Sequence, residues 1–512
     1  MFVTIESSAL CGMQCIPVRV EVDVAKGFPC FEMVGYLGSE VREAKERVRV
    51  ALKNIGTELP AGRITVNLAP ADVHKAGTAF DLPIAVGILA ASGHIAPEST
   101  KGILMVGEVG LGGEICPVRG ILPIVKQAVI RGITHCMVPK ANEKEGAVTE
   151  GIKVIGVENL RQVYEYLTLQ EGQRDAYLPP ATVNLQELFG QEKEGEIPDF
   201  AEVSGQEEVK RAIEVAAAGF HHILLIGPPG AGKTMLAKRL PGILPPLSLS
   251  ESLEISAVYS VAGLLKEEKS LITTRPFLNP HHTISEQALA GGGRIPRPGI
   301  ISLAHHAVLF LDELGEFKRK TLDILRQPLE EKVIRIARLN GSYTYPADFM
   351  LAAATNPCPC GYYPDRKKCR CSEQEINRYL GRISGPILDR IDICAQVPPV
   401  KLEQLSSGKR GESSASMRER ILDARERQEK RYKKENLRFN SQLGSNDILR
   451  FCTLGSKEQK LLKAAFQSMG LSARAYHRIL KVARTIADLE GSEEIREIHL
   501  TEAICYRLPD WK

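Results

Sequence analysis

The chain has 512 residues, of which 44% are hydrophobic and 25% are charged, and its formal net charge is only +4. This composition is ordinary for a globular protein in water, and the length predicts about two to four domains. The small net charge excludes a uniformly basic nucleic-acid binder, so any affinity for a polyanion has to arise from local clusters or from repetition around an oligomer.

The sequence also argues against secretion and membrane insertion. Its first residues show no basic stretch followed by an apolar core, and no run approaches the roughly 20 apolar residues of a membrane-spanning helix. We therefore expect a cytoplasmic protein without a membrane partner. In that setting the twelve cysteines are better explained as buried thiols plus one metal site than as a disulfide framework.

Residues 1–168 mix the patterns of strands and helices. Alternating runs at 17–24 and 63–70 predict strands, periodic runs at 39–55 and 79–92 predict helices, and the glycine-punctuated stretch 103–121 predicts a hairpin. This mixture favours an α+β domain. The periodicity then breaks around two adjacent prolines, and residues 169–198 are predicted to form a linker.

From residue 199 to 398, short apolar runs alternate with helical patterns. The runs at 221–227, 307–313, 348–357 and 392–398 are typical of buried parallel strands, so this region is predicted to be an α/β domain. After a Ser- and Gly-rich break, the remaining residues, 399–512, carry helix-period patterns and predict a helical domain. The chain as a whole is thus predicted to be a multi-domain α/β protein.

The strongest motif follows the first of these strands. It reads GPPGAGKT and matches the phosphate-binding pattern G-x-x-x-x-G-K-[ST] at every fixed position, with a helical pattern directly after it. Backbone N–H groups of such a loop wrap the phosphates of ATP, the lysine reaches the β- and γ-phosphates, and the threonine hydroxyl binds Mg²⁺. The predicted ATP-binding residues are Gly227, Pro228, Pro229, Gly230, Ala231, Gly232, Lys233 and Thr234.

Polar residues end the next two predicted strands. Asp312 and Glu313 follow one apolar run, and an aspartate there is placed to hold Mg²⁺ while the adjacent glutamate polarises an attacking water. Asn356 ends the other run, where its amide is able to hydrogen-bond the same water and the γ-phosphate. This combination predicts hydrolysis of ATP rather than phosphoryl transfer to a bound acceptor.

Two arginines further along the chain are candidates for contacts with ATP. Arg390 precedes the last predicted strand, and in ring ATPases an arginine in such a loop reaches the neighbour's γ-phosphate. Arg474 begins a helix of the C-terminal part and is placed to contact the nucleotide from a lid. For both residues, a solvated surface charge is the alternative.

Residues 330–349 predict a β-hairpin around Asn340-Gly341. Basic side chains on such a hairpin, repeated around a ring, would bind a phosphate backbone without reading sequence. A charged, solvated hairpin edge is the alternative. The basic candidates for contact with DNA are Lys332, Arg335 and Arg338 in the hairpin, and Arg294 and Arg297 in a glycine-rich insert before the acidic strand.

Four cysteines stand directly after the predicted sensor strand, in the sequence NPCPCGYYPDRKKCRC. Two Cys-x-Cys pairs separated by a loop are able to complete a tetrahedral Zn²⁺ site, although the spacing within each pair is tighter than usual. A redox pair or simple buried thiols are the alternatives. A bound metal would be structural and would clamp a loop that positions Arg390 or touches DNA. The predicted ligands are Cys358, Cys360, Cys369 and Cys371.

Taken in order, GPPGAGKT, LFLDEL, AATNPCPCG, SGPILDRIDI and SARAYHRILKVARTIADLEG resemble the AAA+ ATPases of the magnesium-chelatase-like group, and specifically the YifB/ComM family. The stretch 275–314 resembles that family throughout, and the resemblance covers nearly the whole chain. It implies a homo-hexameric motor with Asp312 and Glu313 as the Mg²⁺ and water residues. It also implies that Asn356 is the first sensor, Arg390 the finger acting on a neighbour and Arg474 the lid sensor.

The same resemblance carries a substrate. Members of the ComM type are ATP-driven DNA helicases that promote branch migration during uptake of transforming DNA, so branched or single-stranded DNA is the expected partner. Two other functions use the same ATP chemistry. One is a chelatase-type ATPase that drives metal insertion into a tetrapyrrole, and the other is an ATPase that remodels protein partners.

The N-terminal part resembles the proteolytic domain of Lon proteases, most clearly over residues 106–145. Peptide cleavage there needs a serine hydroxyl activated by a lysine amine. In the resemblance the serine position falls on Ala79 and the lysine position on Leu122. The domain is therefore expected to be an inactive protease that assembles the ring or guides DNA.

Overall fold

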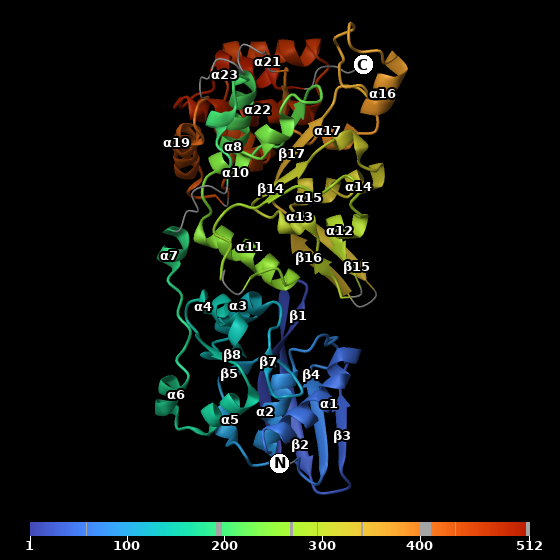
Figure 1. Cartoon of the computed structure of the whole chain (residues 1–512). Coiled ribbons are helices and arrows are strands. Elements are labelled where there is room, and N and C mark those ends of the chain that lie inside the picture. The colour runs from blue at the N-terminus through green and yellow to red at the C-terminus, as the bar shows by residue number, and fades with distance from the viewer. Residues whose placement is uncertain are drawn as a thin grey trace.

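The structure is a computed structural model of the chain. It describes residues 1–57, 59–190, 197–266, 270–293, 295–338, 341–383, 385–399, 411–435 and 437–507. The molecule is elongated, with the first third of the chain at one end and the remainder at the other (Figure 1). Among the helices described, none is both long and apolar enough to cross a bilayer.

The N-terminal body is built on a seven-stranded mixed sheet with the order β3-β4-β2-β1-β5-β8-β9. Alternation explains the long central strands, because Val18, Val20 and Val22 of β2 are buried between exposed neighbours. The helix over 81–91 is apolar all round and is wholly buried against β1 and β2. The strands are β1 (Phe2–Cys11), β2 (Gln14–Ala25), β3 (Cys30–Val34), β4 (Arg63–Ala69), β5 (Ile103–Met105), β8 (His135–Pro139) and β9 (Lys153–Val157).

The other predictions for this body agree with the structure. The two expected helices are α1 (Ser39–Asn54) and α2 (Asp81–Ala91), and the expected hairpin is formed by β6 (Glu108–Val109) and β7 (Ile115–Cys116), which pair antiparallel. The remaining helices are α3 (Ile121–Ile130), α4 (Glu143–Ala147) and α5 (Leu160–Thr168).

Residues 169–198, predicted as a linker, run between the two bodies and contain the short helices α6 (Glu171–Tyr177) and α7 (Leu185–Gly190) (Figure 1). Leu185 and Leu188 pack in a small apolar cluster with Leu122 of the first body and Leu253 of the second. This connection is therefore packed against both bodies.

The second body contains a five-stranded sheet with the order β11-β14-β17-β10-β18, and each of its four strand pairings is parallel. The four strands expected from apolar runs are β10 (Ile223–Ile226), β14 (Val308–Leu311), β17 (Met350–Thr355) and β18 (Ile393–Gln396). The fifth, β11 (Phe277–Leu278), was not predicted. Parallel pairing brings the carboxyl ends of β10, β14 and β17 to one edge of the sheet, where the motif residues follow.

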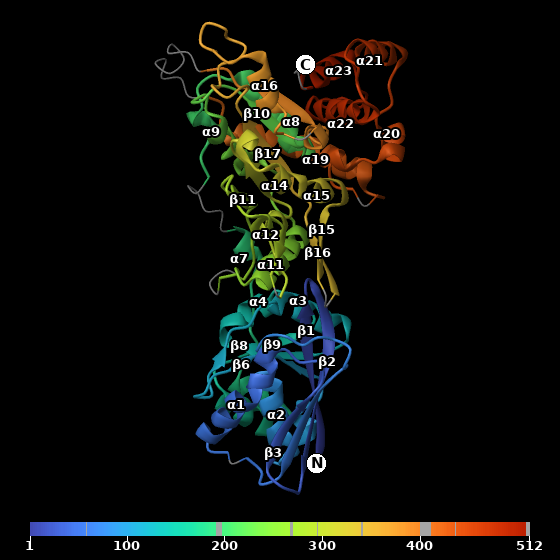
Figure 2. The same ribbon diagram turned by 90° about the vertical axis from the view of Figure 1, so that its right-hand side faces the viewer.

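Helices cover both faces of this sheet, and the C-terminal helices close one side (Figures 1 and 2). The buried face of the helix over 473–489 joins the same hydrophobic core as β10 and the helix over 207–219. The core helices are α8 (Glu207–Gly219), α9 (Lys233–Ala237), α10 (Leu240–Ile243), α11 (Leu249–Ala262), α12 (Glu286–Ala290), α13 (Ile300–Leu303), α14 (Arg319–Asp323), α15 (Arg326–Glu331), α16 (Glu373–Leu380) and α17 (Gly385–Leu388). The C-terminal helices are α19 (Ser414–Tyr432), α20 (Ser445–Phe451), α21 (Ser456–Ser468), α22 (Ala473–Leu489) and α23 (Glu497–Cys505).

The two bodies meet at two places. Helix α3 packs on α11, where the Gly120 N–H donates to the carbonyl of Ser260 at 3.2 Å. The turn between β1 and β2 reaches the hairpin of β15 (Val333–Arg338) and β16 (Gly341–Pro346), and the nearest side-chain atom to a Cβ built on Gly12 belongs to Tyr343, at 3.3 Å. Leu10 and Met13 pack on the core beneath that hairpin.

Candidate nucleotide-binding and hydrolysis site

The predicted phosphate loop lies between β10 and α9. Two of its glycines have positive φ angles, +74° at Gly230 and +88° at Gly232, a conformation that favours glycine. The Lys233 ammonium donates hydrogen bonds to the carbonyls of Gly227 and Pro228, at 2.7 and 3.0 Å, and so folds back over its own loop. Burial lowers the pKa of Lys233, although Asp312 and Glu313 nearby favour its charged form.

The side chains predicted to hold Mg²⁺ face one another across the sheet edge. The Thr234 hydroxyl donates to Oδ2 of Asp312 at 2.7 Å, and the other oxygen of that carboxylate accepts the Glu313 N–H at 3.0 Å. A hydroxyl and a carboxylate at this separation are the hard oxygen ligands that Mg²⁺ prefers, so these two residues fit the ion.

Asn356 lies in the same group, since its Oδ1 accepts a hydrogen bond from the Lys233 ammonium at 3.0 Å. Glu313 differs from the others. Its backbone has a φ of +52°, in the left-handed region, and its half-exposed carboxylate lies 3.6 Å from Nδ1 of His282. The sequence gave no reason to single out His282, and the only local signal was the His281-His282 pair in the insert before the acidic strand.

Arg390 and Arg474 come together at a different place. Both guanidinium groups pair with the carboxylate of Glu330, Arg474 at 3.3 Å and Arg390 in closer contact. The two arginines line a cavity of about 140 Å³ together with Arg478 and Lys481. Helices α9 and α22 lie on opposite sides of the upper body in Figure 2, and none of the contacts described for Arg474 involves the phosphate loop of its own chain.

The cysteine cluster has the dimensions of a metal site. The four sulfur atoms lie within 4.8 Å of one another, and the separations of Cys358 from Cys360, Cys358 from Cys369 and Cys360 from Cys369 are 3.4, 3.7 and 3.6 Å. A tetrahedron with Zn–S bonds of about 2.3 Å has edges of about 3.8 Å. The Gly361 and Tyr363 N–H groups also donate to Cys358 Sγ, which favours a thiolate. The four residues therefore fit Zn²⁺.

The loop that carries these cysteines leans on the phosphate loop. A Cβ built on Gly361, whose φ is +84°, would stand 2.3 Å from Cδ of Pro229, so only glycine fits at this contact. Beside it lies a cavity of about 840 Å³ between Pro228, Pro229, Tyr362 and Tyr363. The cluster therefore touches the nucleotide loop as well as following the Asn356 strand.

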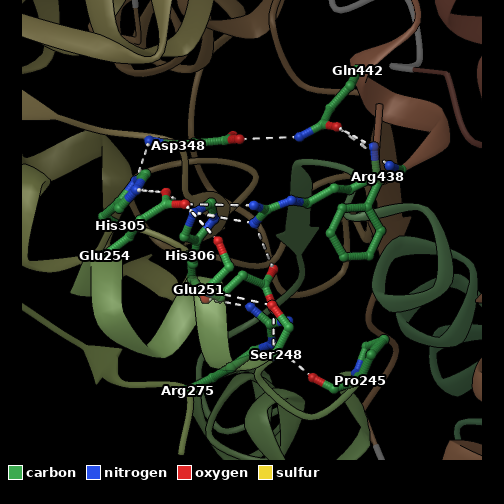
Figure 3. Close-up of polar contacts among 12 residues, drawn as sticks. Pro245, Ser248, Glu251, Glu254, Arg275, His305, His306, Asp348, Arg438 and Gln442 are labelled. Atoms are coloured by element: carbon green, nitrogen blue, oxygen red, sulfur yellow. Dashed lines mark hydrogen bonds and ion pairs between the residues drawn. The ribbon is translucent and has the colours of Figure 1, made fainter. Parts of the chain in front are cut away.

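A second group of potential ligands consists of Glu254, His305 and His306 (Figure 3). His305 Nδ1 accepts the Asp348 N–H at 3.1 Å, so its proton is on Nε2, which lies 3.2 Å from the Glu254 carboxylate. His306 Nε2 approaches the same oxygen at 2.9 Å, and these contacts lower the pKa of Glu254. Because the two rings supply protons rather than lone pairs, this group is a hydrogen-bonded joint and does not fit a metal.

This joint connects the ATPase core to the C-terminal region. Arg438, which follows α19, approaches Glu251 at 3.4 Å and Glu254 at 3.5 Å (Figure 3). Gln442 donates to the Asp348 carboxylate at 3.0 Å. The position of the C-terminal helices is thus fixed by charged contacts as well as by apolar packing.

The hairpin predicted to contact DNA is present as β15 and β16, in antiparallel register with Arg338 opposite Gly341. Arg335 is exposed at its surface, whereas Lys332 lies at its base and pairs with Asp348 at 3.1 Å. Arg338 Nε approaches the carbonyl of Gly293 at 3.4 Å. Arg297 is also exposed. Of the other residues predicted for this surface, Asn340 and Arg294 lie outside the described residues.

The two positions of the absent Ser-Lys dyad are occupied by packed apolar side chains. Ala79 lies half-buried against one hydrophobic cluster of the N-terminal body, and Leu122 is 2% exposed in another. The Leu122 N–H donates to Glu145 at 3.0 Å. Neither position offers a nucleophile or an amine.

Comparison with known proteins supports this assignment of the motifs. Three family models match: magnesium chelatase, subunit ChlI, over residues 199–405; subunit ChlI of Mg-chelatase over 20–142; and the ChlI C-terminal part over 411–507. An archaeal Lon protease of Thermococcus kodakarensis is 28% identical over 145 residues, 27% of this chain and 22% of that protein.

Two similar proteins cover nearly the whole chain. The competence protein ComM of Haemophilus influenzae is 44% identical over 504 residues, which are 98% of this chain and 96% of that protein. The protein YifB of Escherichia coli is 43% identical over 507 residues, which are 99% of this chain and 97% of that protein. From this full-length similarity and the matched models, the chain belongs to the YifB/ComM family of magnesium-chelatase-like AAA+ ATPases.

Proposed function

We propose that the protein is a cytoplasmic homo-hexameric motor that hydrolyses ATP to move DNA strands, promoting branch migration in recombination or natural transformation. The observation that carries the ATPase part is the meeting of Lys233, Thr234, Asp312 and Asn356 at one sheet edge, with Glu313 beside them. The DNA part is supported by the similar protein named for competence.

In the proposed reaction, residues 227–234 bind the phosphates of ATP, and Lys233 exchanges its carbonyl partners for the β- and γ-phosphates. Thr234 and Asp312 would hold Mg²⁺, which neutralises phosphate charge when bound. Glu313 accepts a proton from a water that Asn356 orients. The water oxygen bonds to the γ-phosphorus as the bond to the β–γ bridging oxygen breaks, giving ADP and inorganic phosphate.

We further propose that Arg390 and Arg474 act on the ATP of the adjacent subunit. They meet at Glu330, on the side of the core away from their own phosphate loop (Figure 2). A head-to-tail ring brings that side of one subunit to the loop of the next. Glu330 would then keep both guanidinium groups paired until the neighbour's phosphate replaces it.

In this proposal the chain has four parts. Residues 1–168 form a Lon-like domain without the catalytic dyad, which assembles the ring or guides DNA, and residues 169–198 connect it to the motor. Residues 199–398 form the AAA+ core with the cysteine insert, and residues 399–512 form the helical lid domain.

DNA is expected to accelerate hydrolysis several-fold, with branched DNA as the strongest test substrate. Steady-state ATPase rates measured without DNA, with single-stranded DNA and with a four-way junction check this, with Lys233→Ala as the inactive control. The double variant Arg335→Ala with Arg338→Ala should keep the basal rate and lose the stimulation, because it removes positive charge from the proposed contact with phosphates.

Arg49→Ala provides the matched control, since Arg49 is an exposed arginine on α1, paired with Glu46, in the other body. Hydrolysis that ignores every DNA would argue against a DNA motor. It would favour the chelatase-type function, for which the matched magnesium chelatase models are the supporting observation, or a protein-remodelling one.

For the cysteine cluster we propose structural zinc. Cys358→Ser combined with Cys360→Ser removes two of the four ligands, so bound zinc should fall from about one ion per chain to near zero. The ATPase rate should fall as well, because the cluster's loop touches Pro229 through Gly361. Elemental analysis and ATPase assays measure both effects. Cys505→Ser, at an exposed cysteine remote in sequence, is the control; metal content unaffected by the double change would rule out this site.

A further inference from the structure

Glu313, the proposed base, has an unusual restraint. Its backbone is left-handed, and the partner of its carboxylate in the described structure is the imidazole of His282, 3.6 Å away. No lysine or arginine contact is described for this carboxylate. The water-activating group is thus held by a side chain that has no part in the phosphate loop, the Mg²⁺ residues or the sensor.

His282 is itself placed by packing on two sides. Its ring lies 4.1 Å, between centroids, from that of His281 and meets Phe317 edge-on at 6.4 Å. His281 in turn is fixed by a 2.9 Å contact between its Nδ1 and the Thr283 hydroxyl. Since Phe317 is buried behind the acidic strand, the imidazole has a defined position beside the carboxylate.

The segment that carries His282 leads directly to the proposed DNA-contacting surface. It continues through α12 into the short strands β12 (Gly291–Gly292) and β13 (Arg297–Pro298). Arg338 of the hairpin reaches the carbonyl of Gly293, and the Tyr345 hydroxyl donates to the carbonyl of Pro296 at 2.7 Å. The insert is therefore bonded to the DNA-facing hairpin at one end and touches the hydrolytic carboxylate at the other.

We propose that His282 is a positioning residue that holds Glu313 away from the attacking water until DNA engages the hairpin and the insert. Movement of the insert then releases the carboxylate. This makes ATP hydrolysis conditional on DNA at each site. The inference rests on the proposed function for its trigger, but the restraint itself acts without DNA.

The test compares His282→Ala with the unaltered protein in ATPase assays with and without a four-way junction. Loss of the restraint should raise the DNA-free kcat about two- to fivefold, as expected for one partly exposed ion pair, and should bring the stimulation ratio toward one. KM for ATP should stay the same, because His282 touches no residue of the phosphate loop in the described contacts.

Two further variants separate positioning from a general structural effect. His282→Asn keeps an N–H donor near the place of Nδ1 and should restore the low basal rate and the stimulation. His281→Ala removes the adjacent ring without removing the contact to Glu313 and should change the basal rate less than His282→Ala does.

A DNA-free kcat of His282→Ala equal to or below that of the unaltered protein overturns the restraint, and so does a failure of His282→Asn to differ from His282→Ala. If the unaltered protein is not stimulated by DNA while His282→Ala still has a raised basal rate, the restraint stands and the DNA motor fails. The two ideas are therefore tested by different rows of one experiment.

Discussion

Glu313→Gln is expected to lower the kcat for ATP hydrolysis about a thousandfold while leaving ATP binding intact. The glutamine keeps the size and polarity of the side chain but cannot accept the proton of the attacking water, and a positioned base contributes about a hundred- to ten-thousandfold. Steady-state phosphate release and equilibrium binding of a fluorescent ATP analogue give the two quantities.

Lys233→Ala serves as the contrast, because it should lose ATP binding together with hydrolysis. Glu316→Gln is a matched control at an exposed glutamate three residues along the chain, which pairs with Arg382 at 3.4 Å, and it should retain most of the rate. If Glu313→Gln hydrolyses ATP within tenfold of the unaltered rate, another group activates the water and the assignment of the base is wrong.

Arg390→Ala is expected to reduce kcat by roughly a thousandfold, the usual contribution of an arginine that stabilises transition-state charge. The loss should be much larger than that of Arg450→Ala, at an exposed arginine on α20 paired with Glu435. Arg474→Ala should behave like Arg390→Ala but with a smaller loss, because Arg474 is more exposed where both meet Glu330.

A mixing experiment tests whether Arg390 acts on the neighbouring subunit. Arg390→Ala and Glu313→Gln are each inactive alone, yet a ring that contains both has some interfaces with an intact Glu313 on one side and an intact Arg390 on the other. Random mixing in equal amounts should restore about a quarter of the interfaces, since each intact half has a chance of one in two. A mixture as inactive as its components would mean that Arg390 does not act across subunits.

Local patterns were enough to predict the parts of the fold whose residues carry their own signal. The runs ending at Ile226, Leu311 and Thr355 are apolar at every position, so their strands and their parallel pairing follow from composition. The phosphate loop was equally clear, because its glycines, lysine and threonine are required at fixed spacing.

What escaped prediction depends on contacts between distant segments. The two-residue strand β11 exists only because β14 pairs with it, and His282 matters only because the left-handed turn at Glu313 brings the carboxylate to it. In the same way, no sequence spacing places Arg474 beside Glu330, or Glu254 beside two histidines fifty residues later. Such sites are visible only once tertiary packing is known.

The contact between the turn at Gly12 and the hairpin at Tyr343 has a mechanical consequence. Strand β1 has ten residues, a length of about 33 Å, and its pairing along β2 makes it a stiff rod between the far end of the N-terminal sheet and the hairpin. A tilt of about 5° of that sheet would shift the tip of the rod by about 3 Å, close to the 3.4 Å spacing of nucleotides along one DNA strand. A protease fold without its dyad is thereby kept as a lever arm whose stroke matches one nucleotide.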